Sequence, residues 1–243
     1  MAYTTIDKPS DYFNTKLYTG TGSSNSISGI GFAPDWVWIK NRGLSGHHML
    51  FDKVRGATKA LYSNLTDAET TVSGHLTSFD SDGFTLGDNS GKGSTNGNTE
   101  TYASWNWLGA NGTASNSNGS ITSTVSANTT AGFSIVSYTG NGTAGATVGH
   151  GLSSKPGMMI FKERNGATGW VVYQHKNTSA PATEYLQLNT TAATADYAGY
   201  FNDTEPTSSV FTLGNDTGIN ENTDTYIAYC FAEKKGYSKF GSY

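Results

Sequence analysis

The sequence is short of several residue types and patterns that mark common classes of protein. Cys230 is the only cysteine among 243 residues, which excludes an intrachain disulfide and a metal site built from several cysteines. Lysine and arginine number 15 against 19 acidic residues, without a basic block, so we expect no nucleic acid partner. No stretch approaches the roughly 18 apolar residues of a membrane-spanning helix, so we expect no membrane insertion.

Large aliphatic residues are also scarce. Ile, Leu, Val and Phe together make up about 17% of the chain, a level at which disorder must be considered. Against disorder stand a net charge of only −4 and an aromatic content of 12%, because disordered chains are normally rich in charge and poor in aromatics. Gly, Thr, Ser and Asn fill 111 positions. We therefore predict a folded protein with an aromatic core and a surface of hydroxyl and amide groups.

Four blocks of sequence occur twice, in the same order. The pairs are Tyr18–Gly22 with Tyr138–Gly142, Pro34–Arg42 with Pro156–Arg164, Phe84–Gly91 with Phe211–Gly218, and Asn98–Tyr102 with Asn222–Tyr226. Their separations differ by only a few residues, as loop insertions would produce. The pattern predicts a tandem duplication of a unit of about 100 residues.

Short β-branched or aromatic runs, separated by Gly, Asn, Ser and Thr turns, predict strands throughout. No window has a sustained helical period. The expected fold class is all-β, with tandem β-sandwich or jelly-roll-like repeats and little helix. The predicted segments are an N-terminal extension (1–12), a first β repeat (13–109), a Gly/Ser/Asn/Thr linker (110–131), a second β repeat (132–234), and residues 235–243 as a C-terminal tail or the start of a third repeat-like strand. Within the linker, Ile121 and Val125 could mark one short strand.

Positions that are apolar in both copies are predicted to lie in the core. Trp105 and Trp107 could form a platform for stacking sugars, but the matching Tyr229 and Phe231 favour core packing for both pairs. Cys230 lies within the same apolar run and is predicted to be a small buried side chain.

We predict no catalytic residue and no metal ligand, and therefore no enzyme. The five histidines show no metal spacing, and the sequence has neither a hydrolase serine elbow nor a phosphate loop. A polysaccharide depolymerase would need two facing carboxylates, and no such pair is kept between the repeats.

No cofactor is expected, although two turns carry aspartates that could be compared with a calcium site. Asp80 and Asp82 resemble the first half of a calcium loop, but no further ligands follow at the required spacing, so a hairpin turn is favoured. Asp88 and Asp216 lie in the duplicated Gly-flanked turn, where capping of backbone groups accounts for them. Ca²⁺ at either position is the less favoured alternative.

One charged pattern is kept in both repeats. Each copy ends a buried strand with a lysine followed two residues later by an arginine, namely Lys40 and Arg42, and Lys162 and Arg164. A solvated strand end or a salt bridge is the favoured interpretation. A contact with a neighbouring subunit or with an anionic glycan is the alternative.

A ligand-binding surface is predicted from aromatic residues that occur in only one repeat. The candidates are Trp170, His175, Tyr185, Tyr197 and Tyr200. Tyrosines beside Asn, Ser and Thr can bind glycans by stacking and hydrogen bonding at a small entropic cost.

The chain resembles the repeat-bearing virion structural proteins of marine bacteriophages, often described as tail-fibre proteins. The resemblance rests on Tyr138–Gly142, Val148–Leu152, Pro206–Phe211, Ala228–Glu233 and Gly236–Tyr243. It implies a non-enzymatic virion protein, made in the host cytoplasm without a signal peptide. The expected role is a tail-fibre or spike component that recognises a host, and the alternative is a capsid decoration or tail connector protein. The expected partners are other virion proteins, further copies of the chain (a trimer among them), and a host-surface glycan or outer-membrane protein.

Overall fold

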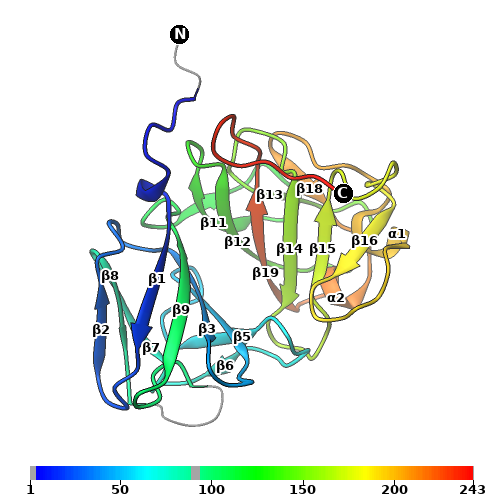
Figure 1. Ribbon diagram of the computed structural model, residues 1–243. Helices are drawn as coiled ribbons and strands as arrows, with labels where there is room; N and C mark the ends of the chain where they lie inside the picture. The colour runs from blue at the N-terminus through cyan, green and yellow to red at the C-terminus, as the bar shows by residue number, and fades with distance from the viewer. Residues whose placement is uncertain (1–3, 89–93, 243) are drawn as a thin grey trace. The chain divides into compact units, whose positions relative to one another are not determined.

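The structure, a computed structural model, describes residues 4–88 and 94–242 (Figure 1). The chain divides into two compact units. The N-terminal unit consists of Lys8–Leu65 and Glu69–Gly112. The C-terminal unit consists chiefly of the chain from Thr113 onward, with short segments at residues 4–7 and 66–68. Among the described residues, no helix is long and apolar enough to cross a membrane.

The N-terminal unit begins with a 3₁₀ turn, η1 (Pro9–Asp11), and is built from two antiparallel sheets. Its large sheet contains, in spatial order, β1 (Phe13–Thr19), β9 (Thr101–Trp107), β3 (Trp36–Asn41), β4 (His48–Asp52), β5 (Lys59–Tyr62) and β6 (Thr70–Thr71). Its small sheet contains β2 (Asn25–Ser28), β8 (Gly83–Leu86) and β7 (Leu76–Asp80).

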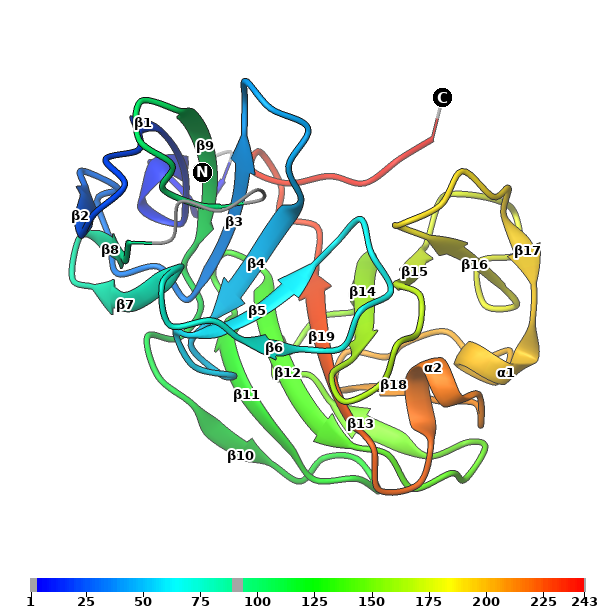
Figure 2. The same cartoon turned by 90° about the horizontal axis from the view of Figure 1, so that it is seen from below.

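The C-terminal unit repeats this plan with additions, and its large sheet can be followed from β10 to β17 in Figure 2. That sheet contains β10 (Ala114–Asn116), β11 (Ser123–Asn128), β12 (Phe133–Thr139), β19 (Thr225–Phe231), β14 (Met158–Glu163), β15 (Val171–Gln174), β16 (Glu184–Gln187) and β17 (Ala195–Asp196). Its small sheet pairs β13 (Thr147–Gly149) with β18 (Val210–Thr212). Two single-turn helices are α1 (Ala198–Phe201) and α2 (Thr217–Asn220).

The duplication read from the sequence is visible in strand order and in packing. The order β1-β9-β3-β4-β5-β6 in one unit corresponds to β12-β19-β14-β15-β16-β17 in the other. Tyr18 stacks on Tyr102 with ring centroids 5.0 Å apart, and Tyr138 stacks on Tyr226 at 5.2 Å. Such offset aromatic pairs add about 0.5–1.5 kcal/mol each beyond the area that they bury.

Each unit has its own core between its large and its small sheet. In the N-terminal unit, Phe84 of β8 belongs to the same buried cluster as Val37 of β3 and Phe51 of β4. In the C-terminal unit, Phe211 of β18 packs edge-on against Phe161 of β14, with centroids 5.1 Å apart. The two layers and the near absence of helix confirm the predicted all-β sandwich class.

The segment 110–131 was predicted to be a linker in which Ile121 and Val125 could mark one short strand, and the structure corrects the linker part of this prediction. It contains β10 and β11, and β11 pairs with β12 from Thr124↔Ser137 to Asn128↔Phe133. Val125 of β11 lies in the core of the C-terminal unit, and the Ser123 hydroxyl donates to the Gly149 carbonyl at 2.7 Å. Small polar residues therefore form strands here, because one valine faces the core and the backbone bonds do not depend on side chain type.

The last strand of the N-terminal repeat turns a different face to the core than expected, whereas in the C-terminal repeat Tyr229 is fully buried as predicted. Tyr102, Ser104 and Asn106 of β9 are fully buried, whereas Trp105 and Trp107 lie half-buried on the opposite face. The Asn106 amide is accommodated by donating to the Ser104 hydroxyl at 3.1 Å. A polar residue on a strand can thus face the core when its amide is hydrogen-bonded.

The end of the chain was predicted as a tail or as the start of another strand. Cys230, on the last strand β19, is buried as predicted, and its burial raises the pKa of the thiol. Beyond β19, residues 235–242 contain no named strand, and Lys234 and Ser238 form an isolated bridge. The described part of this segment is therefore a tail.

Candidate binding surface in the C-terminal unit

Three of the five predicted ligand-binding residues lie together. Tyr185 belongs to β16, Tyr197 directly follows β17, and Tyr200 belongs to α1. Their ring centroids are 4.6 Å apart for Tyr185 and Tyr200, 5.1 Å for Tyr197 and Tyr200, and 6.3 Å for Tyr185 and Tyr197. The pairing of Tyr185 with Ala195 places β17 beside β16, so that the chain enters α1 next to Tyr185.

Hydrogen bonds fix the outer tyrosine of this cluster. The Tyr197 hydroxyl donates to Asp216 Oδ2 at 3.0 Å, and Asp216 Oδ1 accepts from the Gly218 N–H at 2.7 Å as the N-cap of α2. The bond to Asp216 raises the pKa of Tyr197, and burial raises the pKa of Tyr200 to about 12. Both phenols therefore stay protonated at neutral pH, and the one hydroxyl proton of Tyr197 is used in its bond to Asp216.

The three tyrosines of the cluster differ in their exposure to solvent. Tyr197 is 45% exposed, while Tyr185 and Tyr200 are partly buried and pack against the core. Gly199 makes this arrangement possible, since a Cβ there would collide with the Tyr197 ring. The surface is thus a set of rigid aromatic rings held from below by the fold.

The N-terminal unit lacks this surface at the equivalent position. The Gly214 N–H donates to the Tyr200 carbonyl at 2.6 Å, and the Gly87 N–H donates in the same way to the His75 carbonyl at 2.7 Å, so Tyr200 and His75 are equivalent. His75 is only 5% exposed, and burial lowers its pKa to about 4. The tyrosine cluster is therefore a feature of one repeat, superimposed on a duplicated scaffold.

The other two predicted ligand-binding residues are not part of the cluster. The prediction that Trp170 belongs to a ligand-binding surface is wrong, because Trp170 is fully buried. Its backbone N–H donates to the Asn189 side chain at 2.9 Å. Having no counterpart in the other repeat does not make an aromatic residue exposed. His175 is partly exposed and contacts the Glu233 carboxylate at 3.2 Å, as does the Lys176 ammonium at 2.8 Å.

Lys40 and Lys162, which the two repeats share, stabilise the turns that follow their strands. Lys40 Nζ donates to the carbonyls of Asn41 and Leu44 at 2.7 and 3.0 Å. Lys162 Nζ donates to the equivalent carbonyls of Glu163 and Gly166 at the same distances. Each lysine therefore holds the turn that follows its own strand.

This geometry corrects part of the predicted contact surface. Lys162 is fully buried and is not available to a subunit or a glycan, and burial lowers its pKa to about 8. Arg164 is partly buried, with Nη1 3.4 Å from the Ser137 hydroxyl, whereas Arg42 is exposed. A subunit contact through Arg42 stays a prediction.

Asp80 and Asp82, two of the aspartates considered for calcium, are engaged in hydrogen bonds. Asp82 accepts from the N–H groups of Gly31 and Gly29 at 2.6 and 2.9 Å, and these bonds lower its pKa. Asp80 accepts from two hydroxyl groups, those of Ser78 and Thr85. Asp88 is exposed, and Asn89 of the same turn lies outside the described residues. The described ranges contain no cluster of three or more His, Cys, Asp or Glu side chains that could hold a metal ion.

Two buried asparagines that sequence reasoning missed explain the duplicated Tyr-Thr-Gly-x-Gly block. Asn96 donates to the carbonyls of Ser23 and Gly87 and accepts from the Thr21 N–H. Asn220 repeats these three bonds with Thr143, Gly214 and Asn141. The two asparagines have the same separation as the aligned Asn98 and Asn222, which was the signal available in the sequence.

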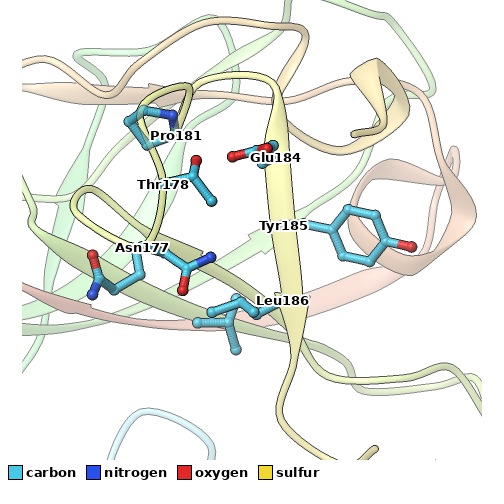
Figure 3. A pocket seen from close by; sticks show the side chains of 8 residues that line it. Asn177, Thr178, Pro181, Glu184, Tyr185 and Leu186 are labelled. Carbon is cyan, nitrogen blue, oxygen red and sulfur yellow. The ribbon is translucent and has the colours of Figure 1, made fainter. Parts of the chain in front are cut away.

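A small hollow lies on the other side of Tyr185 (Figure 3). The hollow is too narrow to hold a water molecule, and it is lined by Val172, Gln174, Asn177, Thr178, Pro181, Glu184, Tyr185 and Leu186. The Glu184 side chain is directed toward Thr178 and Pro181. Glu184 Oε2 is buried and has no hydrogen-bond partner among the described residues.

Fold and surface together define a duplicated β-sandwich protein with an aromatic patch on one of its two units. The chain belongs to the family described as "Domain of unknown function (DUF7483)", which it matches over residues 8–243. Comparison with curated proteins and with solved structures finds no match.

Proposed function

We propose that the chain is a non-enzymatic structural protein of a bacteriophage particle, and that its C-terminal unit binds a host-surface glycan as a tail fibre or spike does. The observation that carries the binding role is the cluster of Tyr185, Tyr197 and Tyr200, which only one of the two equivalent units has. The virion assignment is supported by the resemblance of the sequence to phage structural proteins.

The chemistry of the cluster suits a carbohydrate. Sugars present C–H faces that stack on aromatic rings, and hydroxyl groups that pair with donors and acceptors on the same surface. Tyr197 supplies a partly exposed ring, and its hydroxyl is oriented by Asp216. Rings that are fixed before binding lose little conformational freedom on binding.

The test measures binding of the full chain to a panel of bacterial surface oligosaccharides. Tyr197→Ala is expected to weaken binding tenfold or more, which corresponds to about 1.4 kcal/mol. Tyr62→Ala, which removes a partly buried tyrosine of β5 in the other unit, is the matched control and should leave binding unchanged. Equal affinity of wild type and Tyr197→Ala, with thermal unfolding unchanged, would reject the role of the cluster.

A capsid decoration or tail connector protein is the second candidate, and the open edge of β1 favours it. β1 is the terminal strand of its sheet, whereas the equivalent β12 is covered by β11. Leu17, in the middle of β1, is 61% exposed. Exposed edge strands readily accept a strand from another chain. A reconstruction of intact virions that places the protein on the shell would favour this candidate over the tail-fibre role.

A further inference from the structure

In the N-terminal unit, three polar side chains meet where β4 ends and where the chain leaves β9. Lys53 directly follows β4, and its ammonium donates to the side-chain oxygen of Asn111 at 2.7 Å. The same nitrogen lies 3.6 Å from Asp35 Oδ1. The Asp35 side chain is fully buried, and the Lys53 side chain is 21% exposed. The lysine nitrogen therefore contacts both a carboxamide and a buried carboxyl group.

The second oxygen of Asp35 fixes the turn that carries Asn111. Asp35 Oδ2 accepts from the N–H groups of Gly109 and Asn111 at 2.7 and 3.0 Å. One carboxyl group thus holds Asn111 in place with one oxygen and faces Lys53 with the other. Groups that a fold keeps in contact in this way react far faster than the same groups free in solution, because the entropy of bringing them together has already been lost.

The surroundings of Lys53 favour the transfer of a proton to Asp35. Burial raises the pKa of Asp35, and the Lys53 ammonium and the bound N–H groups offset this effect only in part. The Phe79 ring, whose centroid is 5.9 Å from Lys53 Nζ, adds an apolar neighbour. A carboxyl group that takes up a proton more readily can accept one from the ammonium, which leaves the uncharged amine, the nucleophilic form of lysine.

The C-terminal unit keeps the backbone of this site but not its side chains. The Lys53 N–H donates to the Asp35 carbonyl at 2.9 Å, and the His175 N–H donates to the Gly157 carbonyl at the same distance. Lys53 is therefore equivalent to His175, and Asp35 is equivalent to Gly157. Since the second unit forms the same backbone contact without them, the duplicated scaffold does not need the lysine and the carboxyl group.

We propose that Lys53 and Asn111 form an intramolecular isopeptide bond, with Asp35 transferring the protons. The bond between Lys53 Nζ and Asn111 Cγ forms, and the bond between Asn111 Cγ and Nδ2 breaks. One of the three ammonium protons stays on the new amide nitrogen. The other two pass through Asp35 to Nδ2, which leaves as an ammonium ion. The reaction consumes no other reactant, and Asp35 ends in its starting state.

This bond supplies a covalent link to a chain that cannot form a disulfide within itself, since Cys230 is its only cysteine. Lys53 and Asn111 are 58 residues apart, so the bond closes a loop that contains every strand from β5 to β9. A closed loop restricts the unfolded chain and thereby stabilises the fold. The link does not depend on glycan binding by the tyrosine cluster or on the place of the protein in a particle.

The first experiment measures the mass of the full chain, unfolded after incubation of the folded protein at neutral pH. We expect a mass below that of the sequence by one ammonia. Trypsin should release a branched peptide that joins segment 43–55 to segment 93–155, because Lys53 is no longer cleaved. Lys53→Arg should restore the full mass, whereas Lys59→Arg, the matched control in the same unit, should keep the loss. A wild-type mass equal to that of the sequence would overturn the proposal.

A cyclic imide at Asn111 and Gly112 would release the same ammonia without Lys53, and the variants separate the two reactions. The imide would still form in Lys53→Arg and would give no branched peptide. A loss of ammonia that persists in Lys53→Arg would therefore also overturn the proposal. The isopeptide bond further predicts that the wild type unfolds at a higher temperature than Lys53→Arg, while Lys59→Arg unfolds like the wild type.

The second experiment follows the rate of the mass change in variants of Asp35. Asp35→Asn keeps an oxygen that can accept from the N–H groups of Gly109 and Asn111 but cannot carry protons, and it should form the bond at least tenfold more slowly. Asp35→Glu keeps a carboxyl group and should form the bond faster than Asp35→Asn. A folded Asp35→Asn variant that forms the bond at the wild-type rate would reject the role of Asp35.

Discussion

Single polar residues set the loops of both units. Asn96 and Asn220 each bond three backbone groups of a neighbouring turn, and Lys40 and Lys162 each bond two carbonyls of the turn that follows their strand. These contacts are the same in the two repeats, so the polar residues that the repeats share reflect folding constraints. Residues that differ between the repeats and are exposed, such as Tyr197, are better candidates for binding.

The two lysines allow a matched comparison. Lys162→Met leaves the carbonyls of Glu163 and Gly166 without this donor in a buried place, and we expect a loss of about 1–3 kcal/mol in the free energy of unfolding. Lys40→Met should cost less than about 1 kcal/mol, because Lys40 is partly exposed and water can replace its donors. Chemical denaturation of both variants measures the difference, and equal losses would contradict the role of burial.

The buried ammonium of Lys162 also predicts a dependence of stability on pH. Burial lowers its pKa from 10.5 to about 8, so the unfolded chain binds more protons at this residue between these two values. Its contribution to stability should therefore increase as the pH rises from about 8 to about 10.5. Denaturation of the wild type and of Lys162→Met across this interval checks the sign. A difference between the two that does not change with pH would show that Lys162 does not titrate there.

At the scale of elements, one carboxylate is among the groups that hold the C-terminal tail, together with the Gln174 side chain, which donates to the Gly241 carbonyl at 3.0 Å. Glu233 Oε1 accepts from Lys176 Nζ at 2.8 Å and from the Phe240 N–H at 3.1 Å, and these bonds, with His175 nearby, lower the pKa of Glu233 to about 2. The stabilisation is present above the ordinary pKa of 4.5 and is lost as the pH falls toward 2. The effect should be modest, since the pair is partly exposed.

We therefore expect the tail to loosen in acid while the sandwich stays folded. The protection of the Phe240 amide, taken relative to the intrinsic exchange rate at each pH, should decrease below about pH 4.5, and Glu233→Gln should show lower protection already at neutral pH. Glu205→Gln breaks another exposed ion pair, with Lys155, and serves as the control. Protection of Phe240 that is the same in Glu233→Gln and in the wild type would rule out this role of Glu233.

The sequence predicted the positions of strands better than it predicted which side chains the strands bring together. Aligned blocks located the paired strands because aromatic and β-branched runs recur at matching positions, as in the stacking of Tyr138 on Tyr226. The strand β11 was predicted only as a possible short strand inside a linker, because its Ser- and Thr-rich segment has only Val125 as a strong apolar signal. The tyrosine cluster was predicted as separate candidates only, since β16–β17 pairing, which no local pattern encodes, brings Tyr185 close to Tyr197 and Tyr200.

At the scale of the whole molecule, each unit has its own hydrophobic core, and the two cores are formed by different parts of the chain. We therefore expect the two units to fold separately. Every strand of the C-terminal unit lies between Ala114 and Phe231, and its buried cluster runs from Ile121 to Ala232. A fragment from Thr113 to the end of the chain should therefore be soluble, with cooperative thermal unfolding.

A fragment from Gly132 lacks β10 and β11, which exposes the edge of β12 and removes Val125 from the core. Because uncovered edges pair with other chains, this shorter fragment should self-associate. Sedimentation of the two fragments at matched concentrations tests the prediction. Aggregation of both would indicate that the C-terminal unit needs the rest of the chain to fold, and solubility of both would show that β11 is dispensable.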